Sequence, residues 1–115
     1  MFKFWHKRDE GAEKSAPTEL PTDAKRLHLR FVGQVQGVGF RWTASIVAKN
    51  LGLTGWVRNE SDGSVTAEIQ GSEAHVGAFF SQMLEEYRRH PIKYVVDERE
   101  EIALVPDESR FEVRY

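Results

Sequence analysis

The stretch Gly33–Arg41, GQVQGVGFR, contains three glycines and leads directly into the helix-like segment WTASIVAKNLG. Glycine inside a regular element costs roughly 0.5 to 1 kcal/mol relative to alanine, so this stretch indicates positive-φ turns or close approach of another group to the backbone. Backbone N–H groups that meet a helix start beside a guanidinium form a natural anion site. The alternative is a tight strand-to-helix turn with a surface arginine, and this stretch alone leaves both interpretations open.

Regular elements flank this glycine-rich loop. Apolar and polar residues alternate over residues 26–32, which predicts a strand with one face toward a core. Its inward positions are Leu27, Leu29 and Phe31. After the loop, an apolar stripe with helical spacing ends at Gly52, a residue type that favours the position after a helix. This stripe consists of Ala44, Val47, Ala48 and Leu51.

A β-hairpin and a second helix follow. Residues 53–59 and 64–71 are rich in strand-forming residues and enclose the turn sequence ESDG. The next segment, SEAHVGAFFSQMLEEYRRH, has helical spacing behind Ser72, which is suited to cap the helix, and Pro91 ends it. We expect the apolar stripe of this helix in the core. It consists of Val76, Phe79, Phe80, Met83 and Tyr87.

Two extended segments complete the pattern. Residues 92–105 predict a strand of undefined length and register, and residues 109–115, SRFEVRY, predict a short final strand. The order β-α-β-β-α-β with this extra strand predicts an α+β, ferredoxin-like sandwich, in which two helices cover one face of an antiparallel sheet of four or five strands. This fold supports many unrelated activities, so it does not by itself indicate a function.

The composition limits the classes of function. With 115 residues, of which 40% are apolar and 30% charged, the chain is an ordinary globular protein with room for one domain. A net charge of −2 indicates no nucleic-acid or membrane surface, so anion binding would have to be local. Without cysteine there is no thiol nucleophile and no thiolate zinc site, and no apolar run is long enough for a membrane span. The four histidines lack metal-ligand spacing, and we expect no metal.

Residues 1–24 differ in composition from the rest. Gly11–Asp23 is rich in proline, charge and small residues without periodicity. The first residues, MFKFWHKRDEG, lack the apolar run and cleavage site of a signal peptide, although a weak interfacial anchor or a short docking helix is an alternative there. We expect a mobile leader over residues 1–24, a folded domain over residues 25–115, and a cytoplasmic location.

A second compact motif, GWVRNESDGSVTAEIQG, spans Gly55–Gly71. Together with GQVQGVGFR and the final FEVRY, in this order, it resembles the acylphosphatase family from about Leu27 to Tyr115. The resemblance implies hydrolysis of acyl phosphates, such as acetyl phosphate, carbamoyl phosphate or 1,3-bisphosphoglycerate, to a carboxylate and inorganic phosphate, with no cofactor. Residues 89–105 match the family only loosely, and the leader has no counterpart in the minimal family domain.

The resemblance also assigns candidate site residues. The family's phosphate-binding loop falls on Gln36, Gly37, Val38, Gly39 and Phe40, its anion-binding arginine on Arg41, and its water-positioning asparagine on Asn59. This assignment agrees with the chemistry, because arginine stays charged and grips phosphate oxygens through a fork of N–H groups. A neutral amide is a poor base, but a good carboxylate leaving group and a loose transition state require little deprotonation of water. The alternative for Asn59 is a strand-end residue that starts the turn.

Two other functions remain open. One is a non-catalytic phosphate- or anion-binding interaction module, which has no need of an asparagine that places water. The other is an RNA-binding ferredoxin-like domain, but neither LTGWVRN nor SVTAEIQ fits its aromatic RNP1 strand. We expect a monomeric enzyme that acts on a small molecule, without nucleic-acid partners. Because the chain stops at Tyr115 without zinc-finger cysteines, we expect a free-standing enzyme rather than part of a larger acyl-phosphate-processing one.

Overall fold

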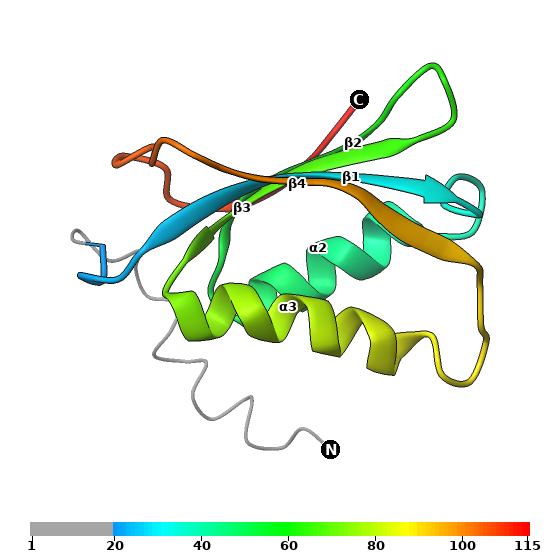
Figure 1. Ribbon diagram of the computed structural model, residues 1–115, viewed down its shortest axis with the longest axis horizontal. Helices are drawn as coiled ribbons and strands as arrows, with labels where there is room; N and C mark the ends of the chain where they lie inside the picture. Colours follow the sequence, from blue (N-terminus) through cyan, green and yellow to red (C-terminus); the bar gives the residue numbers. More distant parts are fainter. Residues whose placement is uncertain (1–19) are drawn as a thin grey trace.

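Two helices cover one face of a five-stranded sheet in the computed structural model, which describes residues 20–115 (Figure 1). The elements in chain order are β1 Lys25–Gly33, α2 Phe40–Asn50, β2 Thr54–Asn59, β3 Val65–Gly71, α3 Glu73–Glu86, β4 Tyr94–Ile102 and β5 Phe111–Arg114. The expected α+β, ferredoxin-like fold is confirmed. The mobile leader expected over residues 1–24 lies, up to residue 19, outside the described residues.

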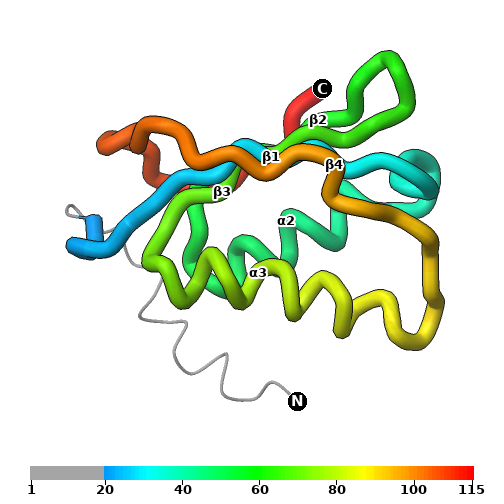
Figure 2. Tube along the Cα trace, viewed as in Figure 1, coloured from blue at the N-terminus to red at the C-terminus, as the bar shows by residue number. Residues whose placement is uncertain are grey.

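The strand order across the sheet is β4-β1-β3-β2-β5. Neighbouring strands are antiparallel as expected, except that β5 pairs with β2 in parallel, so the sheet is mixed. This difference follows from the connection after β4. Ile102, at the end of β4, pairs with Arg26 near the start of β1, and residues 103–110 turn back at that same end of the sheet (Figure 2). Because β2 also starts there, β5 runs in the same direction as β2.

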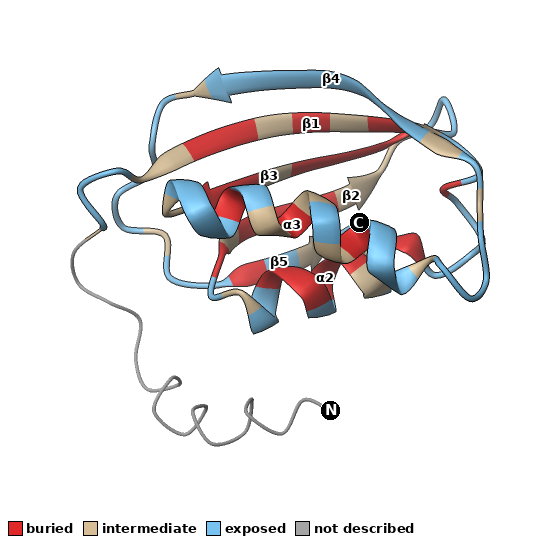
Figure 3. Ribbon diagram, turned by 60° about the horizontal axis from the view of Figure 1, so that its bottom comes forward, coloured by how far each residue is buried: buried red, intermediate tan, exposed pale blue. Residues whose placement is uncertain are grey.

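The core lies between the sheet and the two helices. Leu27, Leu29 and Phe31 of β1 are buried there, as their alternation predicts. Both helical stripes are confirmed as core-facing, and Leu51, Phe80 and Tyr87 lie partly buried at its margin. Figure 3 shows that β4 is exposed along most of its length, because it lies at the sheet edge beyond the helices. Among residues 20–115, neither helix is long and apolar enough to cross a membrane.

The backbones of β2 and β3 approach closely at Gly55. This residue has a φ of 137°, and a Cβ added to it would lie 1.8 Å from the carbonyl oxygen of Glu68 on β3. Any side chain would therefore push the two strands apart, since that distance is far below van der Waals contact. Glycine at this position keeps the hairpin closed, and the hairpin presents Asn59 at the end of β2.

Polar contacts on the face of the sheet opposite the helices fix the connection between β4 and β5. The buried guanidinium of Arg26 lies 2.7 Å from a carboxylate oxygen of Glu108. The buried Gln70 amide donates to the Val105 carbonyl at 3.0 Å and accepts from the Val105 N–H at 2.8 Å. These bonds hold residues 103–110 on the sheet and thereby guide β5 to its place beside β2.

Candidate active site

The loop between β1 and α2 has two glycines with left-handed backbone angles. Gly37 has a φ of 79° and Gly39, the residue before α2, has a φ of 76°. A Cβ would meet nothing within 4 Å at either position, so glycine is used here for its backbone angle rather than for space. Left-handed residues interspersed in a short loop are typical of anion-binding nests of N–H groups.

The start of α2 is left without the usual stabilising side chains. Gly39 makes no side-chain capping bond, and no acidic residue lies in the first turn, which contains Arg41 instead. In contrast, α3 has the predicted cap, since the Ser72 hydroxyl accepts from the His75 N–H at 3.1 Å, and Glu73 lies in its first turn. Exposed N–H groups and a cation at a helix N-terminus are locally unfavourable, and a bound anion would offset both.

The charge of Arg41 has no acidic partner within the part of the chain that the structure describes. Its guanidinium donates to the Arg114 carbonyl at 3.2 Å and lies 4.8 Å from the centroid of the Tyr115 ring. Within residues 20–115, no carboxylate lies within salt-bridge distance of it, whereas Arg26 and Arg30 both pair with acidic side chains. The guanidinium is therefore oriented by β5 and keeps charge and donors available for an anionic ligand.

The side-chain oxygen of Asn59, Oδ1, is a buried acceptor without a donor among the described residues. A buried polar atom without a partner costs about 1 to 3 kcal/mol, so its retention calls for a ligand or a water in contact with it. The oxygen can accept a bond from water, and the amide nitrogen can donate one.

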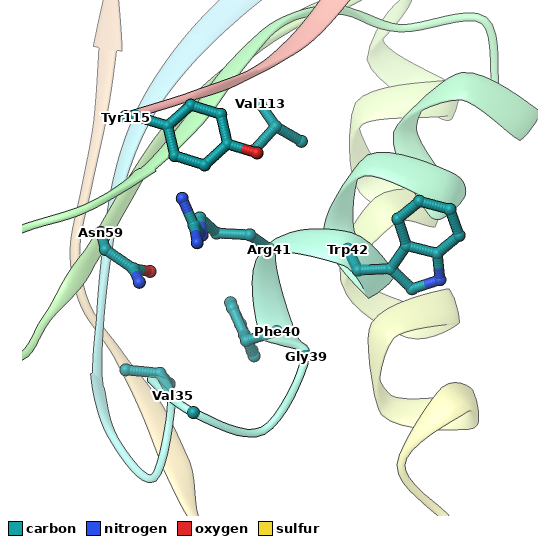
Figure 4. A pocket seen from close by; sticks show the side chains of 9 residues that line it. Val35, Gly39, Phe40, Arg41, Trp42, Asn59, Val113 and Tyr115 are labelled. Carbon is teal, nitrogen blue, oxygen red and sulfur yellow. The ribbon is translucent and has the colours of Figure 1, made fainter.

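Arg41 and Asn59 line one pocket of about 340 Å³ (Figure 4). In the close view, the Asn59 amide and the Arg41 guanidinium point toward one another, although they come from β2 and α2. The other lining residues are Val35, Gly37, Gly39, Phe40, Trp42, Val113 and Tyr115. Of the predicted loop, Gly37, Gly39 and Phe40 thus line the pocket with Arg41, while Gln36 and Val38 do not. Sequence reasoning missed Val35, Trp42, Val113 and Tyr115 as pocket residues.

Phe40 anchors the loop to the core. Its side chain is almost fully buried, and its ring lies 5.0 Å from the Phe31 ring and 5.3 Å from the Tyr94 ring, measured between centroids. Such aromatic contacts add about 0.5 to 1.5 kcal/mol each beyond the area that they bury. The residue next to Arg41 therefore fixes the start of α2 on the sheet.

Gln36 ties the glycine-rich loop to the hairpin turn that follows Asn59. Its amide nitrogen donates to the Glu60 carbonyl at 2.8 Å and to the Ser64 carbonyl at 2.9 Å. Asp62 also stabilises this turn, because its carboxylate accepts hydrogen bonds from Ser64 in the turn and from Arg30 on β1; these bonds keep the pKa of the Asp62 carboxyl well below its usual value. A carboxyl whose pKa is lowered on folding stabilises the folded state at any pH above its ordinary pKa. The Asp62 carboxylate therefore stabilises the turn at neutral pH, and this contribution is lost only as the pH falls into strong acid.

Replacement of Gln36 by alanine is expected to lower the free energy of unfolding by about 1 to 2 kcal/mol, from two lost hydrogen bonds. We also expect kcat for an acyl phosphate to fall about tenfold, because Asn59 and the loop lose their common support. Chemical denaturation and steady-state kinetics measure the two effects.

Gln34→Ala is the matched control, because the Gln34 side chain accepts from the Lys93 N–H at 2.8 Å and holds the same loop on the side of β4. It should cost stability and change kcat by less than about twofold. Equal losses of kcat in both variants would show that Gln36 supports the fold and not the site in particular.

Comparison with known proteins gives one consistent result. The family model described as Acylphosphatase matches residues 27–113. An acylphosphatase from Oceanobacillus iheyensis is 42% identical over 94 residues, which cover 79% of this chain and 99% of that protein. An acylphosphatase from Thermococcus kodakarensis is 57% identical over 53 residues, 46% of this chain and 58% of that protein. The structure of an acylphosphatase from Coxiella burnetii superposes with a TM-score of 0.66 at 33% identity and covers 80% of this chain and 94% of that one.

The fold defines the chain as an α+β protein of the ferredoxin-like class, with an open pocket at the start of a helix. The chain belongs to the acylphosphatase family, whose model covers nearly all of the described residues. Its relatives and its structural neighbours support an acylphosphatase, a hydrolase, as its function. The family identified from the two glycine motifs is thereby confirmed.

Proposed function

We propose that this chain hydrolyses acyl phosphates by in-line attack of water on phosphorus, without a metal, and that Arg41 and Asn59 have the two main roles. One observation supports this proposal above the others: a guanidinium and a buried amide oxygen, neither of which has a charged or hydrogen-bonding side-chain partner within residues 20–115, share one pocket with a helix start that no side chain caps there. A cation and free N–H groups suit a phosphoryl dianion, and the amide oxygen suits a water beside it.

The phosphoryl group would lie against the backbone N–H groups of residues 36–40 and the guanidinium of Arg41. These donors stabilise the charge on the equatorial oxygens of a loose transition state. Gln36 and Val38 would contribute only backbone N–H groups, because the Gln36 side chain bonds to the hairpin and the Val38 side chain has no polar group.

Asn59 would orient the attacking water through Oδ1. The amide has no useful basicity, so the water proton moves to a phosphoryl oxygen as the new P–O bond forms and the bond to the acyl oxygen breaks. The reaction is R–CO–O–PO₃²⁻ + H₂O → R–COO⁻ + H₂PO₄⁻, in which atoms and charge balance. A carboxylate is a good leaving group, so no strong base is required.

Hydrolysis of acetyl phosphate in the presence and absence of EDTA tests this proposal. The folded protein should release carboxylate and phosphate at the same rate in both conditions. No hydrolysis above background would contradict the enzymatic function, and a rate abolished by EDTA would contradict the metal-independent mechanism. Arg41→Ala, purified in the same way, controls for contaminating phosphatases.

The alternative functions receive less support. A pure anion-binding module has no use for a buried amide oxygen beside the anion, and the comparisons do not favour it. RNA-binding domains of this fold stack bases on exposed aromatic rings of the open sheet face. Here Trp56 is only 8% exposed, and the guanidinium groups of Arg58 and Arg114 each lie 5.0 Å from its ring. The cytoplasmic location and the monomeric state stay predictions.

A further inference from the structure

The outer edge of β4 is a long strand edge without a cover in the described part of the chain. β4, Tyr94–Ile102, pairs on one side with β1, and among residues 20–115 no strand pairs with its other side. All of its residues except the two at its ends are exposed, as Figure 3 shows. Its outward backbone groups can therefore pair with another extended segment. Proteins generally cover, shorten or charge such an edge, because it otherwise invites pairing with another chain.

The first part of β4 is apolar. Val95 is 58% exposed and Val96 is 38% exposed. Tyr94 and Val95 also border a hollow of about 380 Å³ with Val32, the partner of Val95 on β1. No charged side chain lies on β4 before Asp97, so this part of the edge lacks the protection that charge would give. Exposed apolar side chains beside a hollow are characteristic of a surface that binds another group.

The second part of β4 is acidic. Residues 97–101 contain four acidic side chains and one arginine, a net charge of −3. Two of these five are engaged, since Asp97 pairs with Arg30 and the Arg99 guanidinium lies 4.3 Å from the centroid of the Phe80 ring. The three glutamates have no cationic partner within salt-bridge distance among residues 20–115. This part of the edge therefore suits a segment with basic side chains.

The first residues of the chain, which lie outside the described residues, have the composition that this edge requires. Residues 1–8, MFKFWHKR, which we call the basic segment, contain three basic side chains and no acidic one, a charge of +3 with histidine neutral. They also contain three aromatic side chains, Phe2, Phe4 and Trp5. The basic segment is thus complementary to β4 in charge, and its aromatic side chains suit the apolar part of the edge.

The basic segment can reach this edge within its own chain. Arg26, near the start of β1, pairs with Ile102 at the end of β4, so the chain enters the sheet beside that end of β4 (Figure 1). β4 has nine residues and is about 30 Å long. Residues 9–19 span up to about 36 Å when extended, at about 3.3 Å per residue. The connection is therefore long enough to place the basic segment beside residues 94–98.

The topology fixes the direction in which the basic segment would run. Followed back from β1, the chain passes the end of β4 before its start, so the basic segment would lie parallel to β4. With Phe4 beside Tyr94 in this direction, FWHKRD lies against YVVDER. The aromatic side chains then meet the apolar part of β4, and the three charged pairs that follow are all of opposite sign. These pairs are Lys7 with Asp97, Arg8 with Glu98 and Asp9 with Arg99.

A second copy of the chain fits this edge less well. Two β4 strands paired edge to edge would bring together two segments that each have a net charge of −3. Like charges on neighbouring strands are destabilising. The charge of β4 thus disfavours its own copy and favours the basic segment.

We propose that the basic segment binds along the outer edge of β4 in the same chain, in the parallel direction. Its aromatic side chains cover Val95 and the hollow beside it, and Arg8 pairs with Glu98. The edge is then closed to other chains. None of the residues that line the candidate active-site pocket belongs to β4, so this inference goes beyond the proposed function and does not depend on it.

Hydrogen exchange on the full chain tests this inference. It reports on the amides of residues 94–102 that do not bond to β1, and the amides of β3 serve as an internal reference for folding. Deletion of residues 2–10 should speed exchange at the β4 edge by at least about tenfold, because the edge loses its cover. Arg8→Glu and Glu98→Arg should each speed this exchange by at least about threefold, the scale of an exposed ion pair. The double variant should return to within about twofold of wild type.

Two single substitutions are matched controls. Glu86→Arg makes the same charge change as Glu98→Arg at an exposed site on α3. Lys14→Glu reverses a charge between the basic segment and β1. Both variants should leave exchange at the β4 edge unchanged.

Three results would overturn the inference. One is a deletion of residues 2–10 that leaves exchange of residues 94–102 unchanged. Another is a double variant, Arg8→Glu with Glu98→Arg, that exchanges as fast as either single variant. The third is protection that disappears on dilution, together with a dimeric mass in light scattering, since the edge would then bind a second copy. Hydrolysis of acetyl phosphate by the wild type bears only on the proposed function, so the two failures are distinguishable.

Discussion

Arg41→Ala is expected to lower kcat/KM for an acyl phosphate by about 10³-fold and to abolish measurable binding of inorganic phosphate. The guanidinium is the one cation among the described residues that line the pocket, so its loss leaves a dianion with backbone N–H groups alone. Arg41→Lys keeps the charge but loses the paired N–H donors, and we expect it to recover at most about a tenth of the lost activity.

Arg41→Ala should leave the fold intact. A cation in the first turn of a helix opposes the helix dipole, so its removal should raise the free energy of unfolding by at most a few tenths of a kcal/mol. Loss of the hydrogen bond from Arg41 to the Arg114 carbonyl acts in the opposite direction. Calorimetric titration measures the affinity for phosphate, steady-state kinetics measure kcat/KM, and thermal unfolding measures stability.

Arg88→Ala serves as the control for Arg41, since Arg88 is exposed and pairs with Glu85 on α3. It should leave kcat/KM and phosphate affinity unchanged. If Arg41→Ala retained wild-type affinity for phosphate, or lost activity only because it unfolded, the assignment of Arg41 to the phosphoryl group would be wrong.

Asn59→Ala is expected to lower kcat by about 10² to 10³-fold while the affinity for inorganic phosphate changes less than about threefold. The reason is the separation of roles: the loop and Arg41 hold the phosphoryl group, and the amide oxygen holds only the water. A loss in kcat and kcat/KM without a loss in ligand binding identifies an interaction made only in the transition state, as expected for a residue that orients the attacking water.

Asn59→Asp distinguishes orientation of water from base catalysis. The carboxylate has nearly the same shape and is a stronger base, but its charge repels a phosphoryl dianion. We expect it to weaken phosphate binding and to fail to restore kcat. Recovery of activity in Asn59→Asp with rising pH would indicate a general base and contradict the neutral-amide role. Asn50→Ala, at the exposed end of α2, is the control and should behave as wild type.

The sequence predicts most of the fold because its patterns are local. The alternation around Leu29, the helical stripe that includes Val47 and the cap at Ser72 each depend on a few neighbouring residues, and all three are confirmed. The parallel pairing of β5 was not predicted, because it depends on the contacts of Arg26 with Glu108 and of Gln70 with Val105, residues far apart in the sequence.

The candidate site likewise contains residues that the sequence predicts and residues that only the tertiary structure brings together. Arg41 and Asn59 come from motifs in the sequence, and they lie in one pocket, although their roles stay predictions. Val113 and Tyr115 were missed as pocket residues, because only the tertiary position of β5 brings them beside α2. For Trp42 a signal existed, since a large apolar residue outside the buried stripe of an amphipathic helix indicates an exposed contact surface. The side-chain bonds of Gln36 depend on the hairpin and have no local signal.

A crystal structure with inorganic phosphate is the most direct test of how the pocket holds a phosphoryl group. We expect the oxyanion about 2.7 to 3.2 Å from the backbone nitrogens of residues 36–40 and from two nitrogens of Arg41, with a water between it and the Asn59 amide oxygen. An ion bound elsewhere, or an Arg41 side chain directed away from it, would contradict the proposed mechanism.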